Sequence, residues 1–296
     1  MWSLSECIPW MTVGLAESIA IVTLNLCTII VFIRKRNLRK RSTYLVINLA
    51  VMDMFVGGVN VPYNLFYIHG MHCNLWKWRA YETNSLILIL LGFFLSGSLI
   101  NVAVIALERV HATFFPFRHR VLKERVYQLT IVVVWVTSVL IAVAYSLLSE
   151  FETFYHAEYL HATYFSICLL IICVSYTCIV IKFRCGAQPH HHGAESRERR
   201  LTMTLLIVTV VSLLLYLPYT VFWFTYIISK YEIWFSLPPL VAFHIYSALL
   251  VLLYANSLVN PILYAIRMRE YRSAFLALCR KPQEQRQDAV FPLREM

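Results

Sequence analysis

Seven long apolar runs divide the chain, and they constrain its fold more than any other feature of the sequence. Each run has about 20 or more mostly apolar residues, the length of an α-helix that crosses the hydrocarbon core of a bilayer. Buried helices of a soluble protein, the alternative, are usually shorter. The sequence therefore predicts an all-α membrane protein built as a seven-transmembrane helix bundle. The runs lie at residues 11–33, 43–68, 83–107, 127–148, 159–181, 201–229 and 240–266.

Basic side chains predict which ends of the spans face the cytoplasm. All but three of the 26 Lys and Arg residues follow the first, third, fifth or seventh run. Because cytoplasmic loops beside a membrane carry an excess of Lys and Arg, these loops and the C-terminus are expected inside. We therefore expect a multi-pass plasma membrane protein with an extracellular segment at 1–10, a seven-span domain at 11–266 and a cytoplasmic tail at 281–296. The net charge of +10 is assigned to this topology and not to nucleic-acid binding.

A short amphipathic helix is predicted over residues 267–280, directly after the seventh run. Apolar residues recur there at helical spacing from Met268 to Leu278, with basic residues between them. This pattern is typical of a helix that lies in the headgroup plane of the membrane. Cys279 at its end is a candidate for palmitoylation, and an unmodified thiol is the alternative.

Asp53 is an acidic residue inside the second run, where a charge is costly and indicates a functional site. Polar residues of other runs are expected at the same depth, and Asn25 is one of them. A carboxylate surrounded by hydroxyl and amide oxygens suits a sodium ion, because this hard cation prefers oxygen ligands. A polar cluster that only holds the helices together is the alternative. No covalent cofactor is expected. The candidate sodium ligands are Asp53, Ser98, Asn256, Ser257 and Asn260.

Two prolines lie inside the sixth and seventh runs, Pro218 and Pro261. Each removes a backbone hydrogen-bond donor and kinks its helix. Tyr216 lies just before the first kink, and Asn260 can satisfy a carbonyl group that the second kink frees. Kinks beside polar residues suit helices that pivot.

Motifs on all seven runs together resemble those of the rhodopsin-like (class A) G-protein-coupled receptors over nearly the whole chain. The resemblance implies a receptor that is not an enzyme and that passes the binding of an extracellular ligand to a heterotrimeric G protein by outward movement of the sixth helix. Arrestin and a receptor kinase are further implied partners. A membrane transporter is the remote alternative. The matching motifs are Asn25, LAVMD at 49–53, ERV at 108–110, Pro116, Trp135, Tyr176, Pro218, NPILY at 260–264 and RMREYRSAFLALCR at 267–280.

The resemblance implies a switch at the cytoplasmic ends of the helices. In the family, the arginine that ends the third helix is restrained by the acid before it and by an acid at the foot of the sixth helix. Phe117 resembles the second-loop residue that inserts into the G protein. An ordinary interfacial ion pair is the alternative. The implied coupling and switch residues are Glu108, Arg109, Pro116, Phe117, Tyr176, Glu198, Asn260, Pro261 and Tyr264.

Family spacing also implies an outer ligand pocket that is apolar and aromatic. Leu91 stands where receptors for monoamines carry the carboxylate that pairs with the ligand, so a lipid or a small uncharged aromatic ligand is expected. An acidic outer rim of Glu82, Glu150, Glu152 and Glu158 leaves a peptide ligand open, and constitutive activity is a further alternative. The implied pocket residues are Tyr63, Asn64, Leu88, Leu91, Leu95, His161, Tyr164, Tyr216, Tyr219, Thr220, Trp223, Tyr246, Leu250 and Tyr254.

Three departures from the family pattern are visible in the sequence. Asn84 replaces the cysteine that most members carry at the outer end of the third helix, so the usual disulfide cannot form. Cys7 and Cys73 are the two cysteines expected outside the membrane and are the candidate disulfide. Cys168 replaces the proline of the fifth helix, and Tyr216 replaces a tryptophan of the sixth. These features are similar to the branch that holds melanocortin, lysophospholipid, cannabinoid and adenosine receptors.

Overall fold

The computed structural model describes residues 4–35, 43–68, 81–151, 154–185, 194–229, 232 and 236–279. Within this part of the chain, seven helices are long and apolar enough to cross a membrane, which confirms the predicted all-α seven-span class. The elements are α1 (Leu4–Arg34), α2 (Thr43–Pro62), η2 (Tyr63–Ile68), α4 (Tyr81–Phe114), α5 (Pro116–Val121), α6 (Glu124–Phe151), α7 (Phe154–Cys185), α8 (Ala194–Ile228), α10 (Pro239–Arg267) and α11 (Arg269–Cys279).

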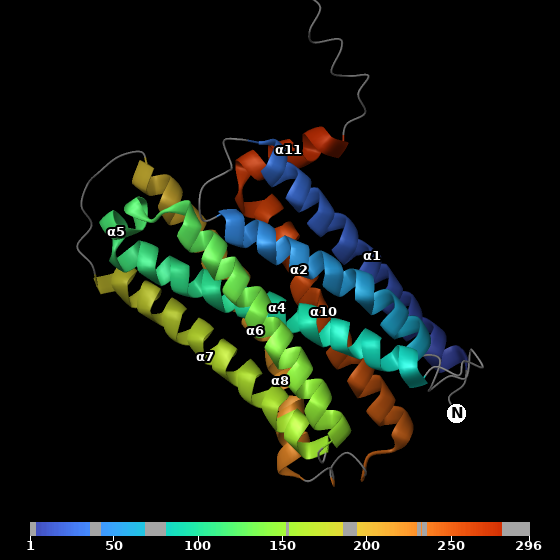
Figure 1. The fold of residues 1–296 in the computed structure, drawn as a ribbon. Coiled ribbons are helices and arrows are strands. Elements are labelled where there is room, and N and C mark those ends of the chain that lie inside the picture. Colours follow the sequence, from blue (N-terminus) through green and yellow to red (C-terminus); the bar gives the residue numbers. More distant parts are fainter. Residues whose placement is uncertain are drawn as a thin grey trace, which may run out of the picture.

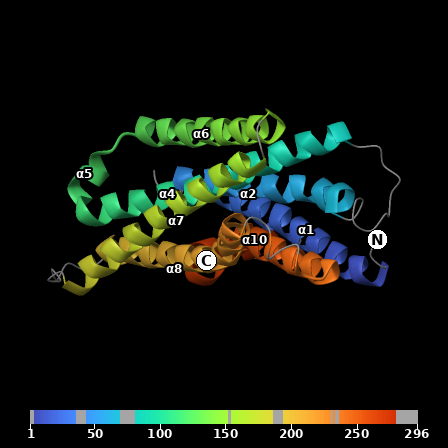
Figure 2. The same ribbon diagram turned by 90° about the horizontal axis from the view of Figure 1, so that it is seen from below.

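The long helices lie side by side in one bundle, with α5 and α11 at the same end (Figure 1). Helix α4 packs against α2, α6, α7 and α8, so it is the central helix of the bundle. Seen from below, α6 lies along one edge, and α8 and α10 lie toward the opposite one (Figure 2). Large apolar side chains such as Leu129 and Leu140 on α6 are exposed on the outside of the bundle, as expected for helices that face lipid.

Several helices are longer than the apolar runs that predicted them. Helix α1 begins at Leu4, before the predicted start at residue 11, and α4 continues to Phe114. An apolar run measures the hydrocarbon thickness, whereas a helix keeps its backbone hydrogen bonds into the headgroup region. The second span changes to π-helix directly after Pro62, where the missing backbone donor disturbs the regular hydrogen-bond pattern.

The predicted amphipathic helix is present as α11, and its tyrosine attaches it to the bundle. Tyr271 is fully buried, and its hydroxyl is 2.7 Å from the Thr28 hydroxyl of α1. Its ring lies 5.6 Å from the ring of Phe32 and 6.1 Å from that of Tyr264, measured between centroids. Burial raises the pKa of the Tyr271 hydroxyl, so this group remains a neutral hydrogen-bonding partner. Helix α11 is thereby connected to both α1 and α10.

Candidate functional site

Asp53 is the centre of a buried polar cluster that joins three helices. Ser98 on α4 and Ser257 on α10 donate hydrogen bonds to Oδ1 of Asp53 at 2.6 and 2.8 Å. Asn260 donates to Oδ2 at 2.9 Å. Since all four side chains are almost completely buried, these bonds replace the water that the carboxylate loses. The structure thus brings together the polar residues that the sequence placed at one depth.

The cluster continues toward α1 and α8. Asn25 on α1 donates to the backbone carbonyl of Ser257 at 3.0 Å, and Asn256 donates to the Tyr216 hydroxyl on α8 at 2.8 Å. Within the described residues, the side-chain oxygens of Asn256 and Asn260 are buried and accept no hydrogen bond. Amide oxygens without a donor beside a carboxylate are the kind of ligands that a hard cation prefers. The donor set therefore fits sodium, and sodium binding itself stays a prediction.

The Glu108 and Arg109 side chains form an ion pair in the last two turns of α4. Arg109 is 4% exposed, and its Nε also donates to Oε2 of Glu108. The other carboxylate oxygen, Oε1, lies 2.7 Å from Nε2 of His119 on α5 and accepts a hydrogen bond of 3.3 Å from the Tyr127 hydroxyl on α6. The Tyr127 hydroxyl is also 3.1 Å from Nε2 of His119. Glu108 therefore connects Arg109 with α5 and α6.

Neither His119 nor Tyr127 was identified from the sequence. His119 lies on the short helix α5, which begins at Pro116, and the backbone of this connection between α4 and α6 decides where the ring lies. Proline at the first helical position was the only local signal. The Glu198 side chain lies outside the described residues, although α8 includes its backbone. The restraint of Arg109 by Glu198 therefore stays a prediction.

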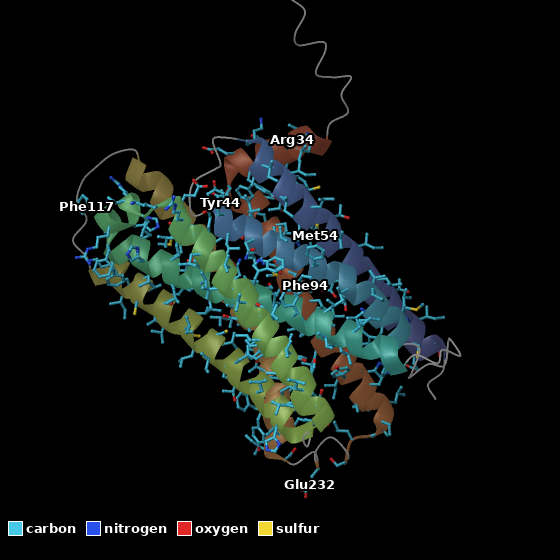
Figure 3. The ribbon with its side chains drawn as sticks, in the orientation of Figure 1. Arg34, Tyr44, Met54, Phe94, Phe117 and Glu232 are labelled. Carbon is cyan, nitrogen blue, oxygen red and sulfur yellow. The ribbon has the colours of Figure 1, made fainter. Side chains whose placement is uncertain are left out.

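Phe117 lies on the surface at this same end of the bundle. Its side chain is 82% exposed, whereas Tyr176 and Tyr264 are buried. In Figure 3, Phe117 on α5 and Glu232, between α8 and α10, lie at opposite ends of the molecule. An exposed phenylalanine on a short helix is accessible to a partner protein.

Pro261 is buried within α10, beside Asn260 of the Asp53 cluster.

The predicted outer pocket residues fall into two groups, and the first is a cluster of aromatic rings around His161. Its ring centroid lies 4.6 Å from that of Phe165, 5.4 Å from Tyr164, 5.9 Å from Tyr219 and 6.1 Å from Trp223. These rings belong to α7 and α8. Leu91, Tyr216 and Thr220 are also buried, and Leu95 is half-buried.

The second group connects η2 with α10. The Tyr63 and Tyr246 hydroxyls lie 3.4 Å apart, and Leu250 and Tyr254 are buried. Asn64 donates to the side-chain oxygen of Asn60 at 2.9 Å. Leu88, in contrast, is 38% exposed in the first part of α4 and has no part in either group of described contacts. The predicted pocket residues therefore form an α7–α8 part and an η2–α10 part, and the two parts meet where the ring of Phe222 on α8 lies 6.4 Å from that of Tyr246 on α10.

Two acidic residues, Glu158 and Glu17, are buried in the bundle, which the sequence did not predict. Glu158, expected on the outer rim, is only 1% exposed, and the Tyr145 hydroxyl of α6 donates to its Oε1 at 3.0 Å. Glu158 lies on the face of α7 that points into the bundle. The sequence shows only that an acid lies near the end of an apolar run and does not show which face of the helix carries it. Glu17 on α1 is 8% exposed and was not singled out as a site residue, although it is the one acid in the first run. Glu82, Glu150 and Glu152 lie outside the described side chains.

The described cysteines include one disulfide and several free thiols. Cys7 is disulfide-bonded, and Cys73 lies outside the described residues, so the pairing of these two cysteines stays a prediction. Cys168, in place of the fifth-span proline, is a free buried thiol. Cys279 ends α11, and its acylation also stays a prediction.

Comparisons with known proteins agree with this architecture. The sequence matches the family model of the 7 transmembrane receptor (rhodopsin family) over residues 24–264. It is similar to the histamine H2 receptor of Canis lupus familiaris, with 27% identity over 270 residues that cover 83% of this chain and 72% of that receptor. It is also similar to the substance-K receptor of Mesocricetus auratus, with 23% identity over 294 residues that cover 90% of this chain and 74% of that receptor. With a family model that matches most of its length and seven apolar helices in its described part, the chain belongs to the rhodopsin family of seven-transmembrane receptors.

Proposed function

We propose that this receptor passes the binding of an extracellular ligand to a heterotrimeric G protein by outward movement of α8. The observation that carries this proposal is the Glu108 network, in which Arg109 is buried and paired at the end of the bundle where α5 presents Phe117. A guanidinium group keeps its charge and can exchange a carboxylate for a backbone carbonyl of an incoming helix. In the active state, Arg109 would leave Glu108 and contact the G protein.

The Asp53 cluster connects this movement with the middle of the bundle. Asn256 on α10 donates to the Tyr216 hydroxyl, two residues before the Pro218 kink of α8. A pivot of α8 at Pro218 would move Tyr216 and break this hydrogen bond. A sodium ion bound beside Asp53 would supply the positive charge that the buried carboxylate lacks. Because the movement would change the set of oxygens around Asp53, we propose that sodium favours the inactive state.

We further propose a lipid or a small uncharged aromatic molecule as the ligand. The ring cluster around His161 supports this class, because aromatic rings with few polar groups bind apolar molecules and orient them by single hydrogen bonds. Leu91 offers no counter-charge for an ammonium group, and Glu158 faces Tyr145 of α6. The two relatives described above are named as receptors for histamine and for substance K, and these two ligands belong to different chemical classes.

The proposed topology has the N-terminus outside and α5, α11 and the C-terminus in the cytoplasm of a plasma membrane protein. The distribution of basic residues supports this orientation, since it places Phe117 and Arg109 on the side where a G protein is found. Arrestin and a receptor kinase would act at the same end.

The movement of α8 can be tested with a fluorine label. Met203 lies on the half of α8 that precedes the Pro218 kink, and its side chain is half-buried. A Met203→Cys variant carrying a trifluoromethyl label should give a second ¹⁹F signal when a nucleotide-free G protein is added, and Arg109→Ala in the same background should not. The labelled protein without Met203→Cys identifies signals from other cysteines. One unchanged signal in the presence of a bound G protein would contradict the movement.

A further inference from the structure

Trp10, His244 and Glu6 connect the beginnings of α1 and α10, two helices that pack against each other. The indole Nε1 of Trp10 on α1 donates to Nδ1 of His244 on α10 at 2.8 Å. On the other side of the imidazole ring, Nε2 of His244 lies 3.0 Å from Oε2 of Glu6 on α1. The His244 and Glu6 side chains are 37% and 39% exposed, so protons from the solvent can reach this connection.

The hydrogen bond from Trp10 determines which nitrogen of His244 carries the hydrogen atom. An indole N–H group is only a donor, so Nδ1 of His244 must be the acceptor and carries no hydrogen. A neutral imidazole has one N–H group, which is therefore at Nε2 and faces the Glu6 carboxylate. The contact between Trp10 and His244 thus requires the neutral form of His244.

Protonation of His244 is incompatible with its contact to Trp10. The proton would bind to Nδ1, and two N–H groups would then face each other across the 2.8 Å that separates Nδ1 from the indole nitrogen. The contact between Nε2 and Glu6 would instead become an ion pair with a charge-assisted hydrogen bond. Protonation therefore breaks the connection of His244 to Trp10 and strengthens its connection to Glu6.

Other acceptors are present for the indole N–H group that His244 releases. Trp10 lines a small pocket together with Glu17 and Ser247. Within the described residues, Oε2 of Glu17 and the Ser247 hydroxyl are buried and have no hydrogen-bond partner. Buried polar atoms without a partner are uncommon in folded proteins. These two atoms can accept from the indole once it no longer donates to His244.

The groups around His244 single it out as the group that binds the proton. Phe243 is its ring neighbour on α10, with 5.7 Å between the ring centroids. Glu17 on α1 and Glu232, between α8 and α10 in Figure 3, are the acids of the neighbouring elements, and neither has a described contact with His244. Histidine is the side chain that ordinarily changes its charge between about pH 5 and 8, whereas a carboxyl group ordinarily changes at lower pH.

We propose that His244 is a proton switch at the extracellular ends of α1 and α10: the neutral ring holds Trp10, and protonation releases it. Acidification outside the cell would then change how these two helices are connected. The side of the membrane on which the protons act rests on the proposed topology. The switch itself goes beyond the proposed function, and it holds or fails without any G protein or ligand.

The test is a ¹⁹F NMR titration of the full chain in lipid nanodiscs, with fluorotryptophan in place of tryptophan. Trp10→Phe identifies the Trp10 signal by its loss. Between about pH 8 and pH 5, the Trp10 signal should move with one midpoint inside this range. The Trp135 signal is the internal control and should stay in place, because the Trp135 indole donates to Oδ1 of Asn48 at 2.9 Å and an amide does not titrate.

Variants assign the titration to His244. His244→Gln can still accept from Trp10 but does not titrate, so the Trp10 signal should become independent of pH. Glu6→Gln removes the charge that stabilises the imidazolium and should lower the midpoint by about half a pH unit. Glu17→Gln is the matched control, because it changes an acid that lines the pocket with Trp10 and has no described contact with His244, and the titration should remain.

A Trp10 signal that does not move over this pH range would overturn the proposal. A titration that survives in His244→Gln, or one that disappears in Glu6→Gln or in Glu17→Gln, would overturn it as well, because a group other than His244 would then bind the proton. If His244→Gln does not fold, the titrations of the unsubstituted chain, Glu6→Gln and Glu17→Gln still decide.

Discussion

Replacing His119 with alanine should raise the ligand-free activity of this receptor. His119 is one of three side chains that contact Glu108, at 2.7 Å from Oε1, and Glu108 in turn pairs with Arg109. Without His119, Glu108 loses a connection to α5, and the arrangement that keeps Arg109 away from a G protein becomes less stable. Since the active state is proposed to lack this arrangement, the change shifts the equilibrium toward that state.

The expected increase in activity follows from the strength of the hydrogen bond that His119→Ala removes. A hydrogen bond to a charged group contributes about 1.5–3 kcal/mol, and the low end applies because the His119 side chain is 20% exposed. A loss of about 1.4 kcal/mol corresponds to roughly a tenfold larger active population while this population is small. Tyr127→Phe removes a longer, 3.3 Å hydrogen bond to the same oxygen, so about two- to fivefold is expected.

The assay is binding of a non-hydrolysable GTP analogue by purified G protein, catalysed by equal amounts of folded receptor without ligand. His119→Gln is the matched control, because its amide can still donate to Glu108 and should give activity close to that of the unsubstituted receptor. Ligand-free activity should rank His119→Ala above Tyr127→Phe, and Tyr127→Phe above His119→Gln. Equal activity in His119→Ala and the unsubstituted receptor would refute the restraint.

Three further predictions test other parts of the molecule. Asp53→Asn should remove the difference in ligand-free activity between sodium and potassium buffers, and a difference that persists would contradict a sodium site at the Asp53 cluster. Tyr271→Phe removes the 2.7 Å hydrogen bond to Thr28 and should lower the unfolding temperature by about 2 °C, measured by thermal denaturation. Trp223→Ala should weaken activation by any agonist of the His161 ring cluster at least tenfold, measured as the concentration for half-maximal G-protein activation; equal potency would show that the ligand binds elsewhere.

The helix class and the Asp53 cluster could be predicted from the sequence for physical reasons. A helix must hold about 20 apolar residues to cross a bilayer, so each span leaves a run of that length. An acid inside such a run needs polar partners, and few polar residues occur at the same depth. Ser98, Ser257 and Asn260 were therefore identifiable, and the structure places all three in contact with Asp53.

The directions of single side chains around a helix were harder to predict. In a membrane span most residues on every face are apolar, so the pattern that separates the inner from the outer face of a soluble helix is weak. This is why Glu158 was expected on the rim and Glu17 was overlooked. The partners of Glu108 depended on the path of the connection between α4 and α6, and the short helix α5 that places His119 has no apolar periodicity of its own.

Nucleotide exchange on a purified G protein tests whether Arg109 couples this receptor to that G protein. Receptor in lipid nanodiscs should accelerate GTP-analogue binding by at least one class of purified heterotrimeric G protein, most strongly in the His119→Ala variant. Arg109→Ala, introduced alone and together with His119→Ala, should return the rate to that of the G protein without receptor, measured with equal amounts of folded receptor. Exchange that survives Arg109→Ala at full rate, or the absence of acceleration with every G-protein class even in His119→Ala, would show that Arg109 does not couple this receptor to a G protein.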